Sequence, residues 1–261
     1  MPLTFDRPPL NEVLVGYSFL PRPDLLIPHI GRFWAEVADD YPSCQHAAVV
    51  VDNLEQPPLG MDLSLPRVWL LNDDTGFLIQ LQQDRLLFSW RDLGRGGKYV
   101  RFPAVRAEFL RVHGLFCAYV KRLTQVPIQP TTFTMTYVNL IRSGEGWSGF
   151  QDHAQVFPAF RWEAPAGGRL PQPKSASWRL DFELPGGLGG LAASLAQGIL
   201  KMDGSPILRL ELTANSGAIA ARDLALEDWC TGAHDTIVHT FKDLTGPEMH
   251  SKYWALQSEA G

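Results

Sequence analysis

The stretch RVWLLNDDTGFLIQLQQDRLLFSWRDLGRGGKYVRFPAVRAEF, residues 67–109, decides the fold of this chain. Apolar and polar side chains alternate through its first half, which is the pattern of strands with one buried face. We expect a three-stranded antiparallel meander over residues 68–71, 76–82 and 86–91. Asn and Asp residues between the first two strands favour a tight turn, because their side chains bond the nearby backbone.

A long amphipathic helix is predicted from Pro103 to Leu123, after glycines break the strand pattern between 94 and 97. Apolar residues recur there at steps of three and four, which is the spacing that lines one face of a helix. We expect this face to pack on the meander. The residues are Val105, Phe109, Val112, Phe116, Tyr119 and Leu123.

The rest of the chain repeats this plan. A strand is predicted at 10–20 and a helix at 24–41 with Asp24 as its N-cap, followed by a short strand at 47–51. The second half contains predicted strands at 131–141 and 178–184, a hairpin of 193–202 with 207–213, and a helix at 226–244, besides a short helix at 147–156. We therefore expect an α+β fold of two similar halves, 1–126 and 127–261, packed as one globular unit with helices on one face of antiparallel sheets. An internal duplication would explain the order, and a cleft between the halves would be a natural ligand site.

Composition narrows the function classes. The chain has 261 residues, 45% of them apolar, and a formal charge of −5, which argues against a surface built mainly to neutralise phosphates. Cys44, Cys117 and Cys230 form no CxxC motif and suggest reduced core thiols. We expect no leader, because the first residues lack a basic region followed by an apolar run, and no apolar run of about 18 residues is present. We expect a cytoplasmic protein without a membrane segment.

A basic cluster with interleaved aromatic residues follows the third strand of the meander. Arg91, Arg95, Lys98 and Arg101 lie near Trp90, and such a cluster can bind single-stranded nucleic acid by charge and stacking. The polar positions of the meander, which are Gln80, Gln82, Ser89 and Arg91, would form an outer face open to contact. Ordinary solvated strand and turn residues would show the same pattern.

Histidines supply the other candidate chemistry. Asp235 and His239 lie four positions apart on a predicted helix, next to His234, and this spacing can place two metal ligands on one face. His153 follows Asp152 in a loop-like region, where functional residues are common. Neither site has an HExxH or GxSxG motif, so exposed polar residues are the simpler interpretation. The glycine run 186–190 lacks the ending of a P-loop.

Three segments together resemble a known family: PPLNEVLVGYSF at 8–19, the core from Trp69 through GFLIQLQQDRLLFSWRD to YVRFPAVRAEF, and AHDTIVHTFKDLTGPEMHSKYW at 233–254. They are similar to a sporadically distributed bacterial family of functionally uncharacterised proteins of about this length. The resemblance implies no activity, cofactor or catalytic residue. A patchy distribution is compatible with phage defence or mobile-element functions.

No complete catalytic constellation is present in the sequence, and no cofactor is expected. The leading hypothesis is a non-enzymatic module that recognises a protein partner, a second copy of itself or a ligand. One alternative is a small metal-dependent or hydrolase-like enzyme that uses His153 or His234 in a cleft. A second alternative is binding of single-stranded nucleic acid through the region from Arg91 to Arg101.

Overall fold

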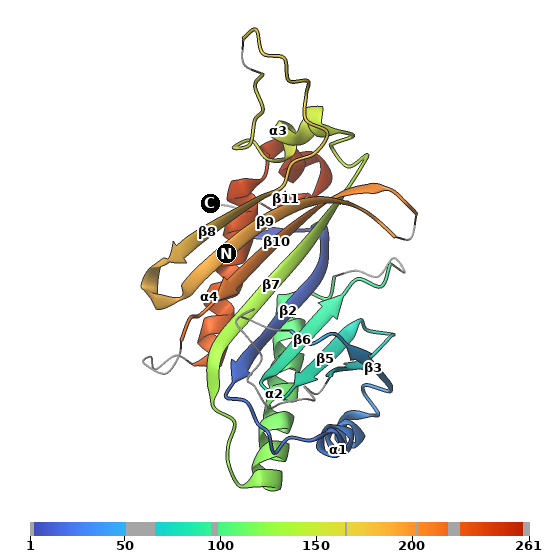
Figure 1. Cartoon of the computed structure of the whole chain (residues 1–261), viewed down its shortest axis with the longest axis vertical. Coiled ribbons are helices and arrows are strands. Elements are labelled where there is room, and N and C mark those ends of the chain that lie inside the picture. Colours follow the sequence, from blue (N-terminus) through green and yellow to red (C-terminus); the bar gives the residue numbers. More distant parts are fainter. Residues whose placement is uncertain are drawn as a thin grey trace. The chain divides into compact units, whose positions relative to one another are not determined.

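The computed structural model describes residues 3–50, 66–94, 99–164, 166–201, 203–218 and 225–257. It shows an α+β fold (Figure 1), as the sequence predicts. The chain divides into two compact units, and each is assembled from separate segments. Unit 1 comprises residues 1–12, 135–216 and 228–261, and unit 2 comprises residues 13–134 and 217–227.

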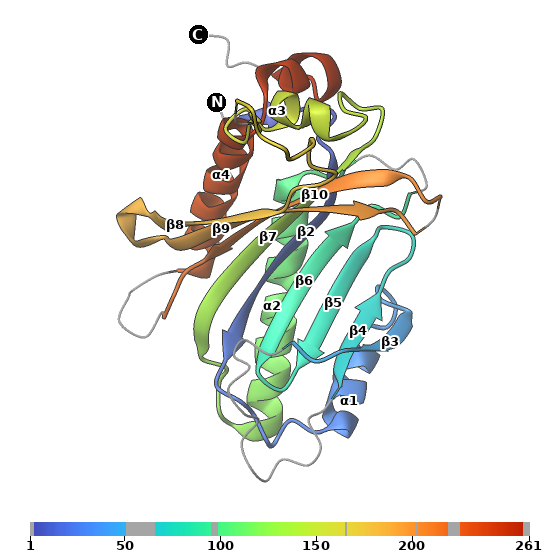
Figure 2. The same ribbon diagram turned by 45° about the horizontal axis from the view of Figure 1, so that its top comes forward.

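The strands of unit 2 follow the order β3-β4-β5-β6-β2 (Figure 2). Their bounds are Leu10–Phe19 for β2, which enters the unit at residue 13, Ser43–Ala47 for β3, Arg67–Leu71 for β4, Phe77–Gln82 for β5 and Arg85–Arg91 for β6. The antiparallel meander β4-β5-β6 is confirmed. Its first turn forms as expected, because Asn72 Oδ1 accepts hydrogen bonds from the backbone N–H groups of Asp74 and Thr75.

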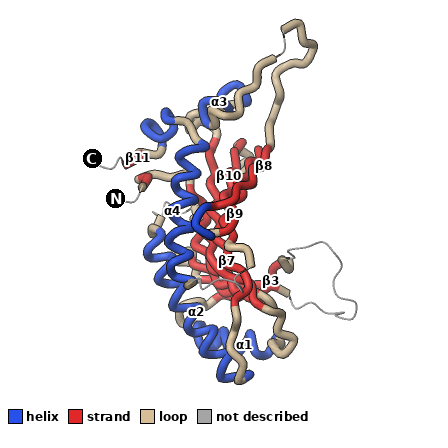
Figure 3. The backbone as a smooth tube through the Cα atoms, turned by 90° about the vertical axis from the view of Figure 1, so that its left-hand side faces the viewer, coloured by secondary structure: helices blue, strands red, loops and turns tan. Residues whose placement is uncertain are grey.

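Two helices cover one face of these strands (Figure 3): α1, Ile27–Val37, and α2, Phe102–Thr124. The ring of Phe116 on α2 lies 6.1 Å from Phe19 of β2 and 5.4 Å from Phe33 of α1. Helix α2 matches the prediction closely. Helix α1 is shorter than predicted, because Asp24 pairs with Arg22 at 2.7 Å and does not cap the helix.

The strands of unit 1 follow the order β7-β10-β9-β8. Their bounds are Pro130–Arg142 for β7, which enters the unit at residue 135, Trp178–Leu184 for β8, Gly189–Ile199 for β9 and Pro206–Asn215 for β10. Helix α4, Leu226–Leu244, lies along one face of them (Figure 3). Shorter elements complete the unit: β1 (Thr4–Phe5) pairs with β11 (Leu256–Gln257), and η1 (Phe150–Asp152), α3 (His153–Val156), η2 (Pro185–Gly187) and η3 (Met249–Tyr253) are single helical turns.

The strand predicted at 47–51 is found earlier in the sequence, at Ser43–Ala47, and Val51 lies outside the described residues. Residues Ser43–Ala47 pair with β4 instead, because an edge strand tolerates polar side chains that face solvent. One consequence is that Cys44 is exposed, whereas Cys230 is a core thiol as expected. No helix within the described ranges is long and apolar enough to cross a bilayer.

Candidate ligand-binding site

A pocket of about 330 Å³ lies beside α3 in unit 1. Aromatic side chains, His153 and polar groups from the loop that leads to β8 line it, and most of the exposed lining is polar. The described lining residues include Phe150, Gln151, His153, Phe160, Arg161, Trp162 and Gln172.

Local hydrogen bonds fix the turn that carries His153. Asp152 Oδ2 accepts bonds from the backbone N–H of Ser148 at 2.7 Å and from its hydroxyl at 2.8 Å. These bonds lower the pKa of Asp152, because they favour its charged form. On the other side of the pocket, the ring of Phe160 stacks on Trp178 of β8 at 4.3 Å with an interplanar angle of 8°. The pocket therefore lies between a turn held by the hydrogen bonds of Asp152 and a loop held against β8 by the stacking of Phe160 on Trp178.

His153 contributes a buried ring nitrogen without a hydrogen-bond partner to the wall. Its side chain is 4% exposed and stacks on Phe150 at 5.3 Å. Its Nδ1 lies 3.3 Å from the carbonyl oxygen of Phe160, and a carbonyl can only accept, so Nδ1 carries the hydrogen. Nε2 is then an acceptor, and it is buried without a hydrogen-bond partner in the structure.

The protonation state strengthens this assignment. Burial lowers the pKa of His153, since it disfavours the imidazolium form, and the ring is therefore neutral near pH 7. A buried acceptor without a donor costs about 1–3 kcal/mol and is rare in folded proteins. A ligand that donates a hydrogen bond would remove this cost. None of the described lining residues is Ser, Thr, Cys or Lys.

Aromatic residues in a predicted loop are a sign of this site that is visible in the sequence and is not among the predicted site residues. Phe160 and Trp162 stand in the segment 158–174, which is predicted to be a loop. Trp162 is 42% exposed, and aromatic residues on loops are frequent in recognition sites. The partner of Phe160, Trp178, lies on the next strand, so the arrangement of these aromatic residues around His153 could not be inferred.

His234 occupies a different environment. Its Nδ1 lies 2.7 Å from the hydroxyl of Tyr137 on β7, and burial lowers its pKa to about 4. Asp235 and His239 are exposed as predicted, and His239 Nδ1 lies 2.7 Å from the backbone oxygen of Asp235. Across the described ranges, no group of three or more His, Cys, Asp or Glu residues is placed to hold a metal ion.

The polar positions of the meander were expected to form an open face, and this expectation is wrong. Gln80, Gln82 and Ser89 are buried. Gln80 donates to the hydroxyl of Ser89 at 3.1 Å and accepts from Arg67 at 3.0 Å. Gln82 exchanges bonds with the backbone of Val50. The alternation of β4 places Arg67 and Trp69 on the face of the two glutamines, and their large side chains exclude solvent from the amides.

Only Arg91 and Arg101 of the predicted basic cluster lie within the described residues, so the cluster stays a prediction. The Arg91 guanidinium lies 5.0 Å from the ring of Trp69, and the Arg101 guanidinium lies 5.9 Å from the ring of Tyr99. Trp90 is buried and packs on Tyr99 at 4.9 Å, so it is not a surface stacking platform. Arg95 and Lys98 lie outside the described residues.

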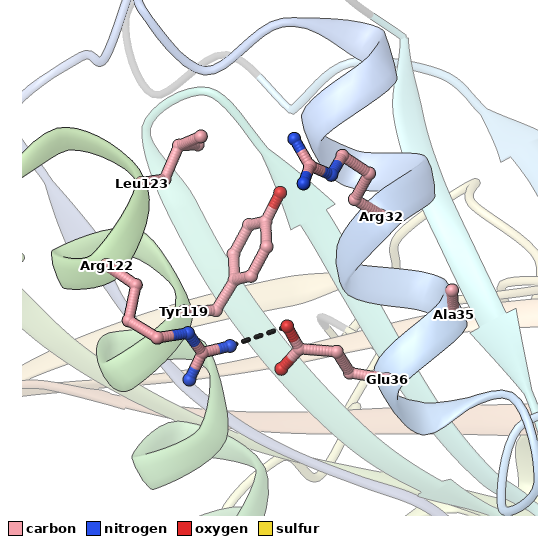
Figure 4. Close-up of a pocket in the computed structure, with 6 residues that line it drawn as sticks. All are labelled: Arg32, Ala35, Glu36, Tyr119, Arg122 and Leu123. Atoms are coloured by element: carbon pink, nitrogen blue, oxygen red, sulfur yellow. Dashed lines mark hydrogen bonds and ion pairs between the residues drawn. The ribbon is translucent and has the colours of Figure 1, made fainter.

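A second pocket, of about 440 Å³, lies between α1 and α2 in unit 2 (Figure 4). Arg122 pairs with Glu36 at 2.5 Å on its rim. The hydroxyl of Tyr119 already donates to the backbone oxygen of His29 at 2.7 Å. The exposed Arg32 adds a charge, but this pocket presents no buried group that lacks a partner.

Comparisons with known proteins add little. No family model matches the chain, and no curated protein matches it. A solved structure of DynU16, described as a protein in the dynemicin biosynthetic locus, is 11% identical, with 90% of this chain and 96% of that chain covered and a TM-score of 0.27. A likeness at this TM-score supports no inference about function.

Proposed function

We propose that this protein is a recognition module that binds a small organic molecule in the pocket around His153. The observation that carries the proposal is that His153, a residue of the pocket wall, has a buried Nε2 acceptor without a hydrogen-bond partner. A hydroxyl, amine or amide N–H of the ligand would donate to Nε2 once a small rotation of the His153 ring brings this buried atom to the pocket surface. A planar ring beside that donor would contact Phe150, Phe160 and Trp162, because aromatic surfaces contribute strongly to binding.

The same features disfavour other ligand types. A neutral imidazole that offers a lone pair repels the lone pairs of a carboxylate or phosphate, so an anionic group would occupy the position beside Nε2 only after protonation of His153, although Arg161 could attract it elsewhere in the pocket. The pocket volume is at the low end of the range for organic ligands, about 300–1,000 Å³. We therefore expect a ligand of one or two rings.

An enzyme is the alternative, because a neutral histidine with a free nitrogen also suits a general base. A hydrolase-like reaction needs a positioned nucleophile or an activated water, and the described lining residues supply no nucleophilic hydroxyl, thiol or amine. Recognition without catalysis therefore has more support. The nucleic-acid alternative and the association with defence or mobile elements stay predictions.

Fragment binding tests the proposal. Phenol- and aniline-type fragments are titrated against isotope-labelled protein, and the side-chain nitrogens of histidine are followed by NMR. We expect Nε2 of His153 to shift as it accepts a bond. His153→Phe keeps a ring and removes the acceptor, and it should weaken binding about tenfold, which corresponds to the net value of one buried hydrogen bond. His239→Phe, on the exposed face of α4, is the control. Equal binding by wild type and His153→Phe would contradict the proposal.

We also infer that the chain arose by duplication of a strand-helix-meander-helix plan. The buried positions of α2 and α4 support this, because Phe109, Val112, Phe116 and Val120 match Cys230, Ala233, Ile237 and Phe241 at a constant separation of 121 positions. A strand tyrosine meets a helix histidine in both units: Tyr17 with His113 at 3.0 Å and Tyr137 with His234 at 2.7 Å. Alignment of relatives tests the duplication, because the segment that contains α2 should match the segment that contains α4.

A further inference from the structure

Strand β8 forms one edge of the strands of unit 1 (Figures 1 and 2). It pairs with β9 along its whole length, from Trp178 opposite Leu195 to Leu184 opposite Gly189. No other described strand pairs with it. Its outward backbone N–H and C=O groups therefore form a template on which another strand can add.

The side chains of this edge differ between its two faces. Trp178, Leu180 and Phe182 share a face with the buried residues Leu195, Ala193 and Leu191 of β9. This apolar row continues to the edge and is uncovered there, since Phe182 is 42% exposed. On the opposite face Arg179 and Asp181 are exposed and pair with each other at 2.7 Å.

We propose that β8 pairs with β8 of a second copy of this chain, antiparallel about a twofold axis at Leu180. In this register Arg179 lies opposite the partner subunit's Asp181, and Trp178 lies opposite the partner subunit's Phe182. Each contact occurs twice, as in any isologous interface. Opposite charges and aromatic pairs across neighbouring strands are the combinations that stabilise a sheet.

The sequence of β8 selects this register over its neighbours. A shift of the twofold axis to Asp181 would place two aspartates directly opposite each other, which is unfavourable. A slip of one residue would set the apolar row against the charged row. The twofold at Leu180 instead continues the apolar face of unit 1 across the interface. It also covers Phe182 and leaves no like charges opposite each other.

Charged residues on an edge strand can also keep a protein monomeric, so the proposal is tested by charge exchange. Sedimentation velocity of the full chain over a concentration series should show a monomer–dimer equilibrium. Arg179→Asp and Asp181→Arg should each weaken the dimer at least about tenfold, since like charges then face each other. An equimolar mixture of the two variants should restore the dimer, because each Asp then meets an Arg.

Arg209→Asp is the matched control, since Arg209 is a half-exposed arginine on the interior strand β10. It should dimerise like the wild type. A wild-type chain that stays monomeric at every concentration would overturn the proposal. So would a dimer that both charge variants leave intact, or a mixture that fails to restore it.

Cross-linking tests the register. In a background with the exposed Cys44 replaced by Ala, Leu180→Cys should form a disulfide-linked dimer under mild oxidation, because the twofold places the two Cα atoms opposite each other. Asp181→Cys should cross-link less. The reverse order would overturn the twofold at Leu180, and circular dichroism of both variants establishes that they are folded.

Discussion

Replacing His234 with Gln should reduce the loss of stability of this protein in acid. The part that is removed is the contribution of His234 to the pH dependence of the free energy of unfolding. Burial lowers the pKa of His234 to about 4 in the folded chain, against about 6.5 in an unfolded chain. Above pH 6.5 the residue is neutral in both states and contributes no pH dependence. As the pH falls from about 6.5 to about 4, the unfolded chain takes up the proton first, so the free energy of unfolding decreases. The difference between the two pKa values corresponds to a decrease of about 3 kcal/mol in the free energy of unfolding.

Urea unfolding at a series of pH values measures this part directly. Between neutral pH and about pH 4, the free energy of unfolding of the wild type should fall by about 3 kcal/mol more than that of His234→Gln. The slopes of the two plots of this free energy against pH should differ by at most about 1.4 kcal/mol per pH unit. His113, His153 and His250 also have lowered pKa values through burial, but they titrate in both proteins and cancel in the comparison.

Loss of the hydrogen bond between Tyr137 and His234 will lower the stability of the variant at every pH in this window, which shifts its curve without changing its slope. His239→Gln, on the exposed side of the same helix, should keep the wild-type slope. Parallel pH profiles for wild type and His234→Gln would refute the reasoning, because burial would then not determine the protonation of this residue.

Three further perturbations follow from the packing. Gly16→Ala should destabilise the chain by about 3 kcal/mol or prevent folding, since the added Cβ would lie 2.3 Å from a backbone oxygen of β6. Gly114→Ala on α2 is the opposite case, because the added Cβ would have no neighbouring atom within 4 Å, and it should raise the melting temperature. Ser89→Ala leaves a buried amide without its acceptor and should cost about 1–3 kcal/mol in urea unfolding. In a thiol-reactivity assay Cys44 should react in the native state and Cys230 only after unfolding, and equal rates would contradict the burial assigned to them.

Local pattern predicted those elements whose stabilising contacts are near in sequence or periodic. The meander β4-β5-β6 follows from alternation and one Asn turn, and α2 follows from a regular apolar stripe. The start of α1 could not be predicted, because Asp24 has two possible partners and the side chain of Arg22 outcompetes the helix terminus. Strand β3 could not be predicted either, because its sequence SCQHA has no apolar alternation.

Burial of polar residues was the main error in predicting the candidate sites. Alternation correctly placed Gln80 and Ser89 on the face opposite the helices. The alternation does not indicate what covers that face. Its exposure to solvent is decided by contacts between strands, such as the hydrogen bond from Arg67 to Gln80. The periodicity of a strand therefore assigns a face, whereas exposure of that face depends on tertiary contacts.

The two histidine candidates look alike in sequence, since His153 follows Asp152 and His234 precedes Asp235. Both are neutral near pH 7 because burial lowers their pKa values, so a lowered pKa does not separate a binding group from a structural one. The difference lies in the second hydrogen bond. His234 meets the hydroxyl of Tyr137, whereas Nε2 of His153 meets no protein donor. A donor-bearing fragment should therefore lose affinity when His153 is replaced and keep it when His234 is replaced, which makes His234→Gln a second control for the binding experiment.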